Sequence, residues 1–373
     1  MVQWIWQQPQ WPHFYWQDAA ILPQTRELQR KIGRLVGRSE LQQAEHQTLD
    51  NLLSNILASS AIEEERLNAH SVRSSLARRL GVAESTPYPV SERSEGVASM
   101  IVDAIENRDA PLSLTRLNQW HQWLFPQESW RIQPVQAGRL RGDEPMQVVS
   151  GRLDRPVVHF EAPPRDGLEQ ELTAFVQWFN ASKDDPLIDP LLRAAIAHLW
   201  FVTLHPFDDG NGRITRALTD LALAQADNQG IRLYAMSVAI LARRQDYYLI
   251  LESTQKGGLD ITGWLSWFLQ TLDATLNNAL GDIDRTVQKT RFWQQHEAVR
   301  GTLGSEQLKV LNRLLDGGEA GFSDGISAGQ YQKVAKVSKA TATRHLAMLL
   351  ELGLLEKLPG GGRSTRYHIR YPA

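Results

Sequence analysis

The sequence predicts a mainly α-helical fold with one small β-hairpin, followed by a carboxy-terminal helix-turn-helix unit. Three observations support this prediction. Apolar residues recur at spacings of three and four through most of the chain, which is the period of an amphipathic helix. A short run rich in β-branched residues, from 146 to 162, interrupts that pattern. After a polar stretch that ends near residue 304, a second helical pattern begins.

Length and composition restrict the possible classes of protein. The chain has 373 residues, which is enough for two or three compact units. Its 42 acidic and 40 basic residues give the whole molecule no polyanion-binding charge. There is no cysteine, which excludes disulfides, thiolate zinc sites and a cysteine nucleophile. With neither a signal peptide nor a long apolar run, we expect a cytoplasmic protein with no membrane partner.

We assign residues 1–100 to an amino-terminal helical region. The first 20 residues are dense in aromatic rings, which favours an extended arm packed against other parts of the protein. From residue 25 to about residue 80 the apolar spacing predicts helices. Residues 85–96 are typical of a loop in their composition.

A second region, residues 101–290, is predicted to form the core. In the hairpin at 146–162, short β-branched runs flank a turn at 151–156. The helical spacing then resumes in five segments: 168–179, 191–204, 214–226, 239–251 and 261–280. The segment at 191–204 is apolar on nearly all sides, which predicts a buried central helix.

A twelve-residue string, HPFDDGNGRITR, begins at His205. Because Pro206 disfavours a helical conformation in the residue before it, we expect the central helix to end here and to present His205 on a loop. Phe207 is interpreted as a buried anchor behind the loop. Asp208 and Asp209 supply carboxylate oxygens, which suit a Mg²⁺ ion that also binds substrate phosphates.

The second half of the string is suited to phosphate. Gly210, Asn211 and Gly212 let the backbone approach an anion, and the helix that follows presents its positive end. Arg213 and Arg216 are three apart, share one helix face and can hold polyphosphate oxygens. Singly, a histidine, a Gly-Asn-Gly turn or an arginine pair is more often structural. Their combination in one string favours a nucleotide site.

The string matches the Fic signature HxFx(D/E)GNGRxxR at every specified position, so the chain resembles the Fic family of protein adenylyltransferases. The resemblance implies a Fic helical core and a nucleotidyltransferase reaction. In that reaction AMP passes from ATP to a tyrosine, threonine or serine hydroxyl of a target protein, the enzyme itself included. His205 would be the general base and Asp209 would hold Mg²⁺.

The resemblance also assigns nucleotide-binding residues. They lie in the loop and the next helix: Phe207, Gly210, Asn211, Gly212, Arg213 and Arg216. Asn211 and the loop amides would form an anion hole, Arg213 would support the phosphates, and Arg216 would take the γ-phosphate. Tyr247 and Tyr248 match an aromatic pair that lies near the adenine in relatives, although adjacent rings on a helix are often core residues.

The hairpin at 146–162 falls where Fic proteins have a flap that docks the target. A peptide strand of the target would add to its edge and hold the hydroxyl at the site. The alternative is an ordinary surface hairpin.

A second constellation lies upstream, where the chain reads SSAIEE from Ser59 to Glu64. Ser59 and Glu63 are four apart and share one helix face. The pattern resembles the Fic inhibitory motif (S/T)xxxE(G/N), which implies that Glu63 pairs with Arg216 and takes the place of the γ-phosphate. Glu64 departs from the motif, where glycine or asparagine is usual. In some relatives this glutamate also supports removal of AMP, and no residue here excludes that reverse reaction.

The last region, residues 305–373, follows a predicted linker at 291–304. A helix at 330–336, a turn and a second helix form a helix-turn-helix pattern. The segments GLLEKLP, GGGRS and TRYHI then resemble a winged-helix hairpin. Between residues 327 and 373 eight lysines and arginines face two glutamates, a net charge of +6.

This charge favours DNA binding through residues 330–370. The proposed contacts lie early in the second helix and on the wing: Thr341, Thr343, Arg344, Arg363 and Arg366. A protein-interaction or purely structural winged helix is the alternative.

Two functions follow from these observations. The first is a protein adenylyltransferase that Glu63 holds inactive at rest. The second is a DNA-binding transcriptional regulator in which the Fic core acts as a sensor. The complete catalytic set favours the enzyme. The aromatic arm and the habits of relatives also lead us to expect a homodimer.

Overall fold

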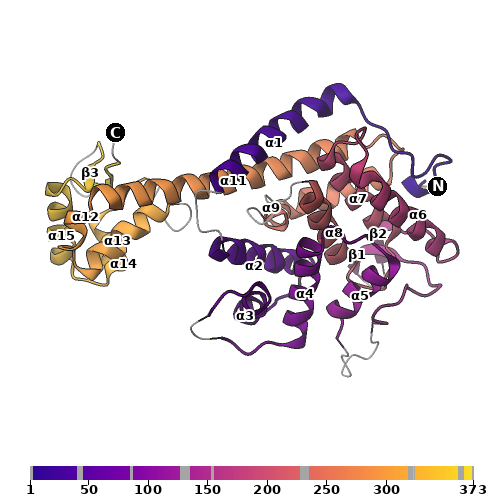
Figure 1. Cartoon of the computed structure of the whole chain (residues 1–373), viewed down its shortest axis with the longest axis horizontal. Helices are drawn as coiled ribbons and strands as arrows, with labels where there is room; N and C mark the ends of the chain where they lie inside the picture. Colours follow the sequence, from indigo (N-terminus) through magenta and orange to yellow (C-terminus); the bar gives the residue numbers. More distant parts are fainter. Residues whose placement is uncertain are drawn as a thin grey trace. The chain divides into compact units, whose positions relative to one another are not determined.

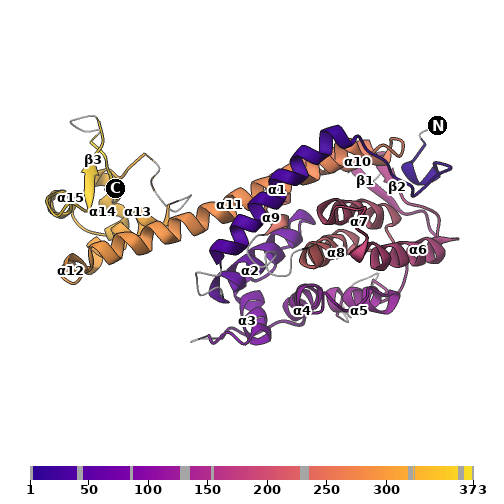
Figure 2. The same cartoon turned by 45° about the horizontal axis from the view of Figure 1, so that its top comes forward.

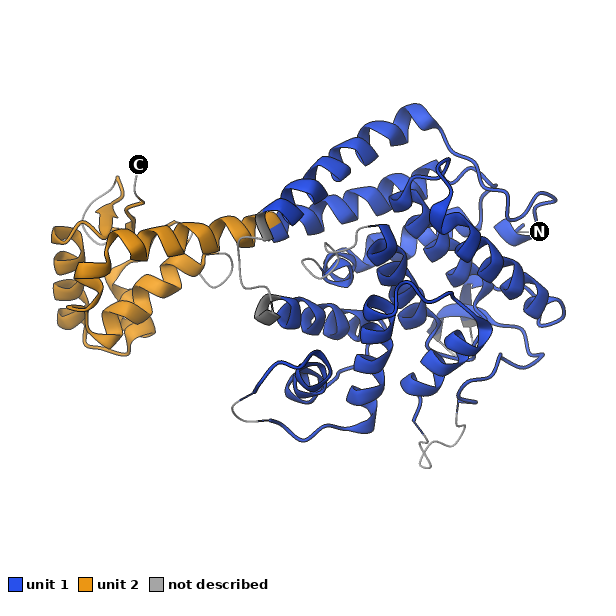
Figure 3. Ribbon diagram, viewed as in Figure 1, with its two compact units in different colours: residues 1–279 blue, residues 280–373 orange. Residues whose placement is uncertain are grey.

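The fold was analysed in a computed structural model, which describes residues 3–39, 45–84, 87–126, 135–152, 155–226, 235–317, 322, 324–359 and 365–371. These residues form mainly helices, with two small antiparallel hairpins (Figures 1 and 2). The prediction of a mainly helical fold with a small hairpin is therefore confirmed. The chain separates into two compact units, residues 1–279 and residues 280–373 (Figure 3). Among the described helices, none is both long and apolar enough to cross a membrane.

The first unit holds most of the elements. They are the short 3-10 helices η1 (Ile5–Gln7) and η2 (Ser182–Asp184), the strands β1 (Gln147–Arg152) and β2 (Arg155–Glu161), and the helices α1 (Asp18–Ser39), α2 (Glu45–Ile62), α3 (Ala69–Leu80), α4 (Glu92–Glu106), α5 (Leu114–Leu124), α6 (Leu168–Ala181), α7 (Pro190–Leu204), α8 (Asn211–Ala226), α9 (Met236–Ala242) and α10 (Arg244–Gln255). Helix α11 (Thr262–Gln295) begins in the first unit and ends in the second.

Helices α7 and α8 form the centre of the first unit and lie side by side in both views (Figures 1 and 2). Helix α7 starts where the Asp189 side chain accepts a hydrogen bond from the Leu191 N–H, with Pro190 in the first turn. Every residue from Leu191 to Leu204 is buried, which confirms the predicted central helix. Helices α4 and α5 pack on α8, and α6 packs on α7.

The aromatic arm packs on its own chain. Trp4 is buried, with its ring edge-on to Phe160 of the hairpin at a centroid distance of 5.4 Å. Trp11 and Phe14 both meet the ring of Trp200 on α7, at 6.2 Å. The arm therefore covers the first unit, as its composition predicts, and it gives no support to the expected homodimer.

Strands β1 and β2 form the predicted hairpin. Their antiparallel register pairs Gln147 with Glu161 and Gly151 with Pro156, with an irregularity between Val148 and Val149. Residues 153 and 154 of the predicted turn lie outside the described part of the chain. Strand β2 packs on α10, which brings the hairpin to one wall of the site described below.

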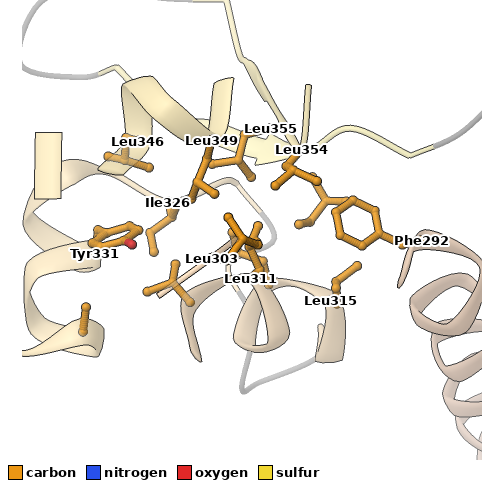
Figure 4. Close-up of a cluster of buried hydrophobic side chains, with 14 of the residues drawn as sticks. Phe292, Leu303, Leu311, Leu315, Ile326, Tyr331, Leu346, Leu349, Leu354 and Leu355 are labelled. Atoms are coloured by element: carbon orange, nitrogen blue, oxygen red, sulfur yellow. The ribbon is translucent and has the colours of Figure 1, made fainter. Parts of the chain in front are cut away.

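The second unit contains α12 (Glu297–Arg300), α13 (Ser305–Asp316), α14 (Ala328–Ala335), α15 (Lys339–Glu351), β3 (Leu355–Lys357) and β4 (Tyr367–Ile369). Ser327 and Ser338 cap α14 and α15, so the two helices start close to the positions predicted for the helix-turn-helix pattern. Their apolar faces join one core (Figure 4), which includes Phe292, Val310, Leu311, Ile326, Tyr331, Leu346, Leu349, Leu354 and Leu355.

The division between the units lies inside α11. The predicted linker at 291–304 contains the end of α11 and all of α12. Phe292 and Trp293 in this segment are buried in the core of the second unit. Helix α11 continues through residue 290 because no glycine or proline interrupts it between residues 282 and 295.

Candidate active site

His205 ends α7 in a left-handed conformation, with φ 47°. Its backbone N–H donates to the Phe201 carbonyl over 3.1 Å. The ring Nδ1 lies 3.2 Å from the Val202 carbonyl, which can only accept, so Nδ1 carries the proton and Nε2 keeps its lone pair. Burial lowers the pKa of His205. The ring is therefore neutral at neutral pH, as a general base requires.

Phe207 and Asn211 fix the shape of the loop. Phe207 is fully buried, and its ring stacks on that of His121 from α5 at 4.2 Å. The Phe207 N–H donates to Asn211 Oδ1 over 2.9 Å, and Asn211 Nδ2 donates to the Phe207 carbonyl over 2.7 Å. The side chain of Asn211 thus closes the loop on itself, and its part in an anion hole stays a prediction.

His121 supports the loop from outside and was not found by sequence reasoning. Its Nδ1 accepts from the Gly138 N–H over 2.8 Å, so Nε2 is the donor to the Asp209 carbonyl, 3.2 Å away. Burial lowers the pKa of His121 to about 4, which keeps this neutral form at neutral pH. No sequence signal identifies His121, because its partners lie far along the chain.

Two glycines leave room that a side chain would fill. Gly210 has φ +79°, and a Cβ there would lie 2.8 Å from the ring of Phe125. A Cβ on Gly212 would lie 2.0 Å from Glu63 Oε1. Glu63 therefore sits against the amino-terminal turn of α8, where the positive end of the helix favours an anion.

Ser59, Glu63 and Arg216 come together as the resemblance implies. Arg216 is 2% exposed, and its Nη2 lies 2.8 Å from Glu63 Oε1. Its Nε donates to Ser59 Oγ, and Nη2 also donates to the Ser59 carbonyl, each over 2.8 Å. The end of α2 thus holds the guanidinium that was predicted to bind the γ-phosphate.

Arg213 has an acidic partner that the sequence analysis missed. Its Nη1 pairs with Glu65, and the same carboxylate pairs with Arg93 from α4. Arg213 Nη2 lies 3.6 Å from Asp209 Oδ1, and the guanidinium lies over the Phe125 ring at 5.1 Å. The one sequence signal that could have found Glu65 is its place as the last of three consecutive glutamates.

Glu64 lies between these two pairs and has a left-handed backbone, with φ 61°. Its carboxylate pairs with Arg244 over 3.0 Å. Glycine and asparagine adopt this conformation at lower cost than other residues. The geometry gives a physical reason for the glycine or asparagine expected at this position.

Asp208 and Asp209 lie at the wall of a cavity of about 1030 Å³. Asp209 Oδ1 accepts from the Gly210 N–H over 2.6 Å, and half of the Asp209 side chain is exposed. Within the described ranges, no group of three or more histidines, aspartates and glutamates could hold a metal by itself. One exposed carboxylate fits a Mg²⁺ ion that takes its other ligands from phosphates and water.

Tyr247 and Tyr248 on α10 also line the cavity, but they differ in exposure. Tyr247 is buried, and its hydroxyl lies 2.9 Å from His198 Nε2. Tyr248 is 37% exposed, and its hydroxyl donates to the Ile62 carbonyl at the end of α2 over 3.1 Å. Tyr248 is thus the better placed of the two to meet a bound base.

The same cavity is lined by His205, by the Gly210–Gly212 segment, by Glu63 and by residues of the hairpin. Its size suits a nucleotide-sized ligand. A buried helix pair, a loop whose imidazole nitrogen keeps its lone pair, and a helix amino terminus beside two arginines are the arrangement expected of a Fic-type domain.

Comparison with known proteins agrees with that class. Residues 111–223 match the Fic/DOC family, so this part of the chain is a Fic domain. Residues 4–82 match a second family, described as a domain of unknown function (DUF4172). That match contains the aromatic arm, α1, α2 and the segment with Glu63 and Glu65.

Two named relatives cover the centre of the chain. The chain is 31% identical to "Protein adenylyltransferase Fic" from Nematostella vectensis over 180 residues, which are 48% of this chain and 36% of that protein. It is 32% identical to "Protein adenylyltransferase fic-1" from Caenorhabditis elegans over 148 residues, 40% of this chain and 25% of that one. The chain therefore spans about a third or less of the length of these two relatives.

Solved structures share the fold. A Fic family protein from Desulfovibrio desulfuricans G20 has a TM-score of 0.50 and 20% identity, and the match covers 93% of this chain and 96% of that one. A variant of Fic-1 from C. elegans has the same TM-score and identity, with 72% of this chain and 74% of that one covered.

Proposed function

We propose that the chain transfers AMP from ATP to a hydroxyl side chain of a target protein. One observation carries this proposal: the lone pair of His205 and the positive end of α8 meet at one cavity of about 1030 Å³. A base and an anion-binding helix end are what attack of a hydroxyl on a phosphate requires. Relatives named as protein adenylyltransferases support the choice of reaction.

In the proposed reaction the target hydroxyl gives its proton to His205 Nε2 while its oxygen attacks the α-phosphorus of ATP. The bond to pyrophosphate breaks in line. The amino terminus of α8 and the guanidinium of Arg216 hold the phosphates. Asp209 would hold Mg²⁺, which when bound neutralises phosphate charge. Replacing Asp209 with asparagine should then raise the Mg²⁺ concentration that half-maximal activity requires.

The position of the label on ATP tests the reaction type. The Glu63→Gly variant is incubated with a lysate of the parent cell and with ATP labelled at either the α- or the γ-phosphate. AMP transfer puts label on target proteins from α-labelled ATP alone. Label from γ-labelled ATP that exceeds the label in the same lysate without the variant would instead indicate phosphoryl transfer, and the proposal would fail.

We also propose that Glu63 inhibits the enzyme. Its carboxylate pairs with Arg216 over 2.8 Å, beside the α8 amino terminus, so it and the γ-phosphate would compete for one guanidinium. In the reverse direction the same carboxylate could orient a water that removes AMP from a modified target. Incubating a modified target with wild type and with Glu63→Gly tests this, because removal by the wild type alone would be expected.

DNA binding by a winged helix in residues 330–370 is the second candidate function. The exposed face of α15 carries Lys339, Thr343 and Arg344, which supports it. Arg366 donates to the Gly325 carbonyl over 2.9 Å, so it also positions the hairpin. Arg363 lies outside the described residues. The affinity for a DNA duplex should fall as the salt concentration rises, and it should also fall in the Arg344→Ala variant. An affinity that changed in neither case would exclude this contact.

We also propose a homodimer, which is supported only by the resemblance to the Fic family. The molar mass measured by light scattering after size-exclusion chromatography distinguishes one copy from two.

A further inference from the structure

Three side chains outside the Fic string form a chain of hydrogen bonds. Ser150 is on β1, His159 is on β2, and Glu252 is on α10. Ser150 Oγ lies 2.6 Å from His159 Nε2, and His159 Nδ1 lies 2.8 Å from Glu252 Oε2. Sequence spacing does not connect these residues, because the hairpin meets α10 only in the folded chain.

The ionised state of Glu252 sets the direction of its bond with His159, and a neutral His159 ring sets the direction of the bond with Ser150. Its other oxygen accepts from Lys256 Nζ over 2.5 Å, and this hydrogen bond lowers the pKa of Glu252. An ionised carboxylate only accepts, so Nδ1 of a neutral His159 carries the ring proton. Nε2 is then an acceptor, and the hydroxyl of Ser150 donates to it. A hydroxyl that points at a base, itself oriented by a carboxylate, is the arrangement of an activated nucleophile.

The trio faces the nucleotide cavity. Ser150, His159 and Glu252 all line the same cavity as His205 and Gly212. Ser150 is exposed, so its hydroxyl is accessible from that space. The electrophile that the proposed function brings there is the α-phosphorus of ATP.

We propose that Ser150 is an acceptor of AMP within its own molecule and that His159 is the base for this step. The inference rests on the proposed function. Ser150 Oγ would form a bond to the α-phosphorus, the bond from that phosphorus to pyrophosphate would break, and the hydroxyl proton would pass to His159 Nε2. The product is a serine AMP ester that occupies the cavity and blocks further transfer to targets.

Mass spectrometry of the Glu63→Gly variant after incubation with ATP and Mg²⁺ locates the AMP. We expect AMP on Ser150, at a rate per molecule that does not change when the protein is diluted. In the same background, His159→Gln should lower the AMP on Ser150, relative to AMP on lysate proteins, by about 100-fold. Ser253→Ala is the matched control, since Ser253 is an exposed serine on α10 beside Glu252, and it should leave the Ser150 signal unchanged.

The outcomes separate this inference from the function on which it rests. AMP on lysate proteins but none on Ser150 overturns the inference, keeps the transferase, and leaves the trio as an anchor of the hairpin. AMP on neither overturns both. A Ser150 signal whose rate rises with protein concentration contradicts transfer within one molecule. A signal that survives His159→Gln contradicts the role of His159.

Discussion

Replacing Glu63 with glycine should activate the enzyme, and the structure sets the size of the effect. Glu63 makes one charge-assisted hydrogen bond to Arg216, over 2.8 Å. Such a bond stabilises the inhibited arrangement, in which Glu63 holds Arg216, by about 1.5–3 kcal/mol, and each 1.4 kcal/mol is tenfold in rate. The Glu63 side chain is 33% exposed, so solvent weakens the bond toward the lower value. We expect activation on the order of 10-fold.

The assay measures the initial rate of AMP transfer from α-labelled ATP to lysate proteins at equal protein concentration. Glu64→Gln is the matched control, because Glu64 is adjacent, 78% exposed and paired with Arg244 rather than with Arg216. It should change the rate by less than about threefold. Equal rates for wild type and Glu63→Gly, or equal activation by both variants, would refute the reasoning.

Three further predictions follow from the same contacts. Glu65→Gln should lower the free energy of unfolding by about 1–3 kcal/mol, because among the described residues the buried Arg213 then keeps only Asp209, 3.6 Å away, as a charged partner. A urea titration that shows no loss of unfolding free energy would contradict the importance of this ion pair. Gly210→Ala should cost about 1–3 kcal/mol by the same measurement, since φ is +79° and the new Cβ meets the Phe125 ring. Because burial lowers the pKa of His205 and its neutral form is the base, the rate should fall with acid only below about pH 6.5, and a midpoint above that value would contradict the assignment.

Local pattern was enough to predict the central helix and the loop. The apolar segment at 191–204 needs burial on all sides, and Pro206 fixes where the helix ends. The hairpin at 146–162 was also a local signal. These features depend on neighbours in the sequence, and the folded chain reproduces them.

Contacts between distant segments could not be predicted from local sequence patterns. Spacing predicted that Ser59 and Glu63 share one helix face, which is wrong, because α2 ends at Ile62 and Glu63 lies in the turn that follows. The pairing of both residues with Arg216 came from the resemblance alone. The pair between Glu65 and Arg213 joins residues 148 apart in sequence. Periodicity describes one element at a time, so it does not show which faces of two elements meet.

The aromatic arm illustrates the same limit. Its composition predicted burial, yet the covering surface was unknown until Trp11 and Phe14 were found against Trp200. The division of the chain inside α11 also depends on distant contacts. Phe292 and Trp293 are buried in a core whose other residues come from later segments of the chain.

The central claim is that His205 removes the proton from the hydroxyl of the target protein. It is tested most directly by comparing Glu63→Gly with Glu63→Gly/His205→Ala in the rate of AMP transfer to lysate proteins. We expect the second variant to be slower by about 100-fold to 10,000-fold, since a general base contributes that much. Equal rates in the two variants would contradict the account.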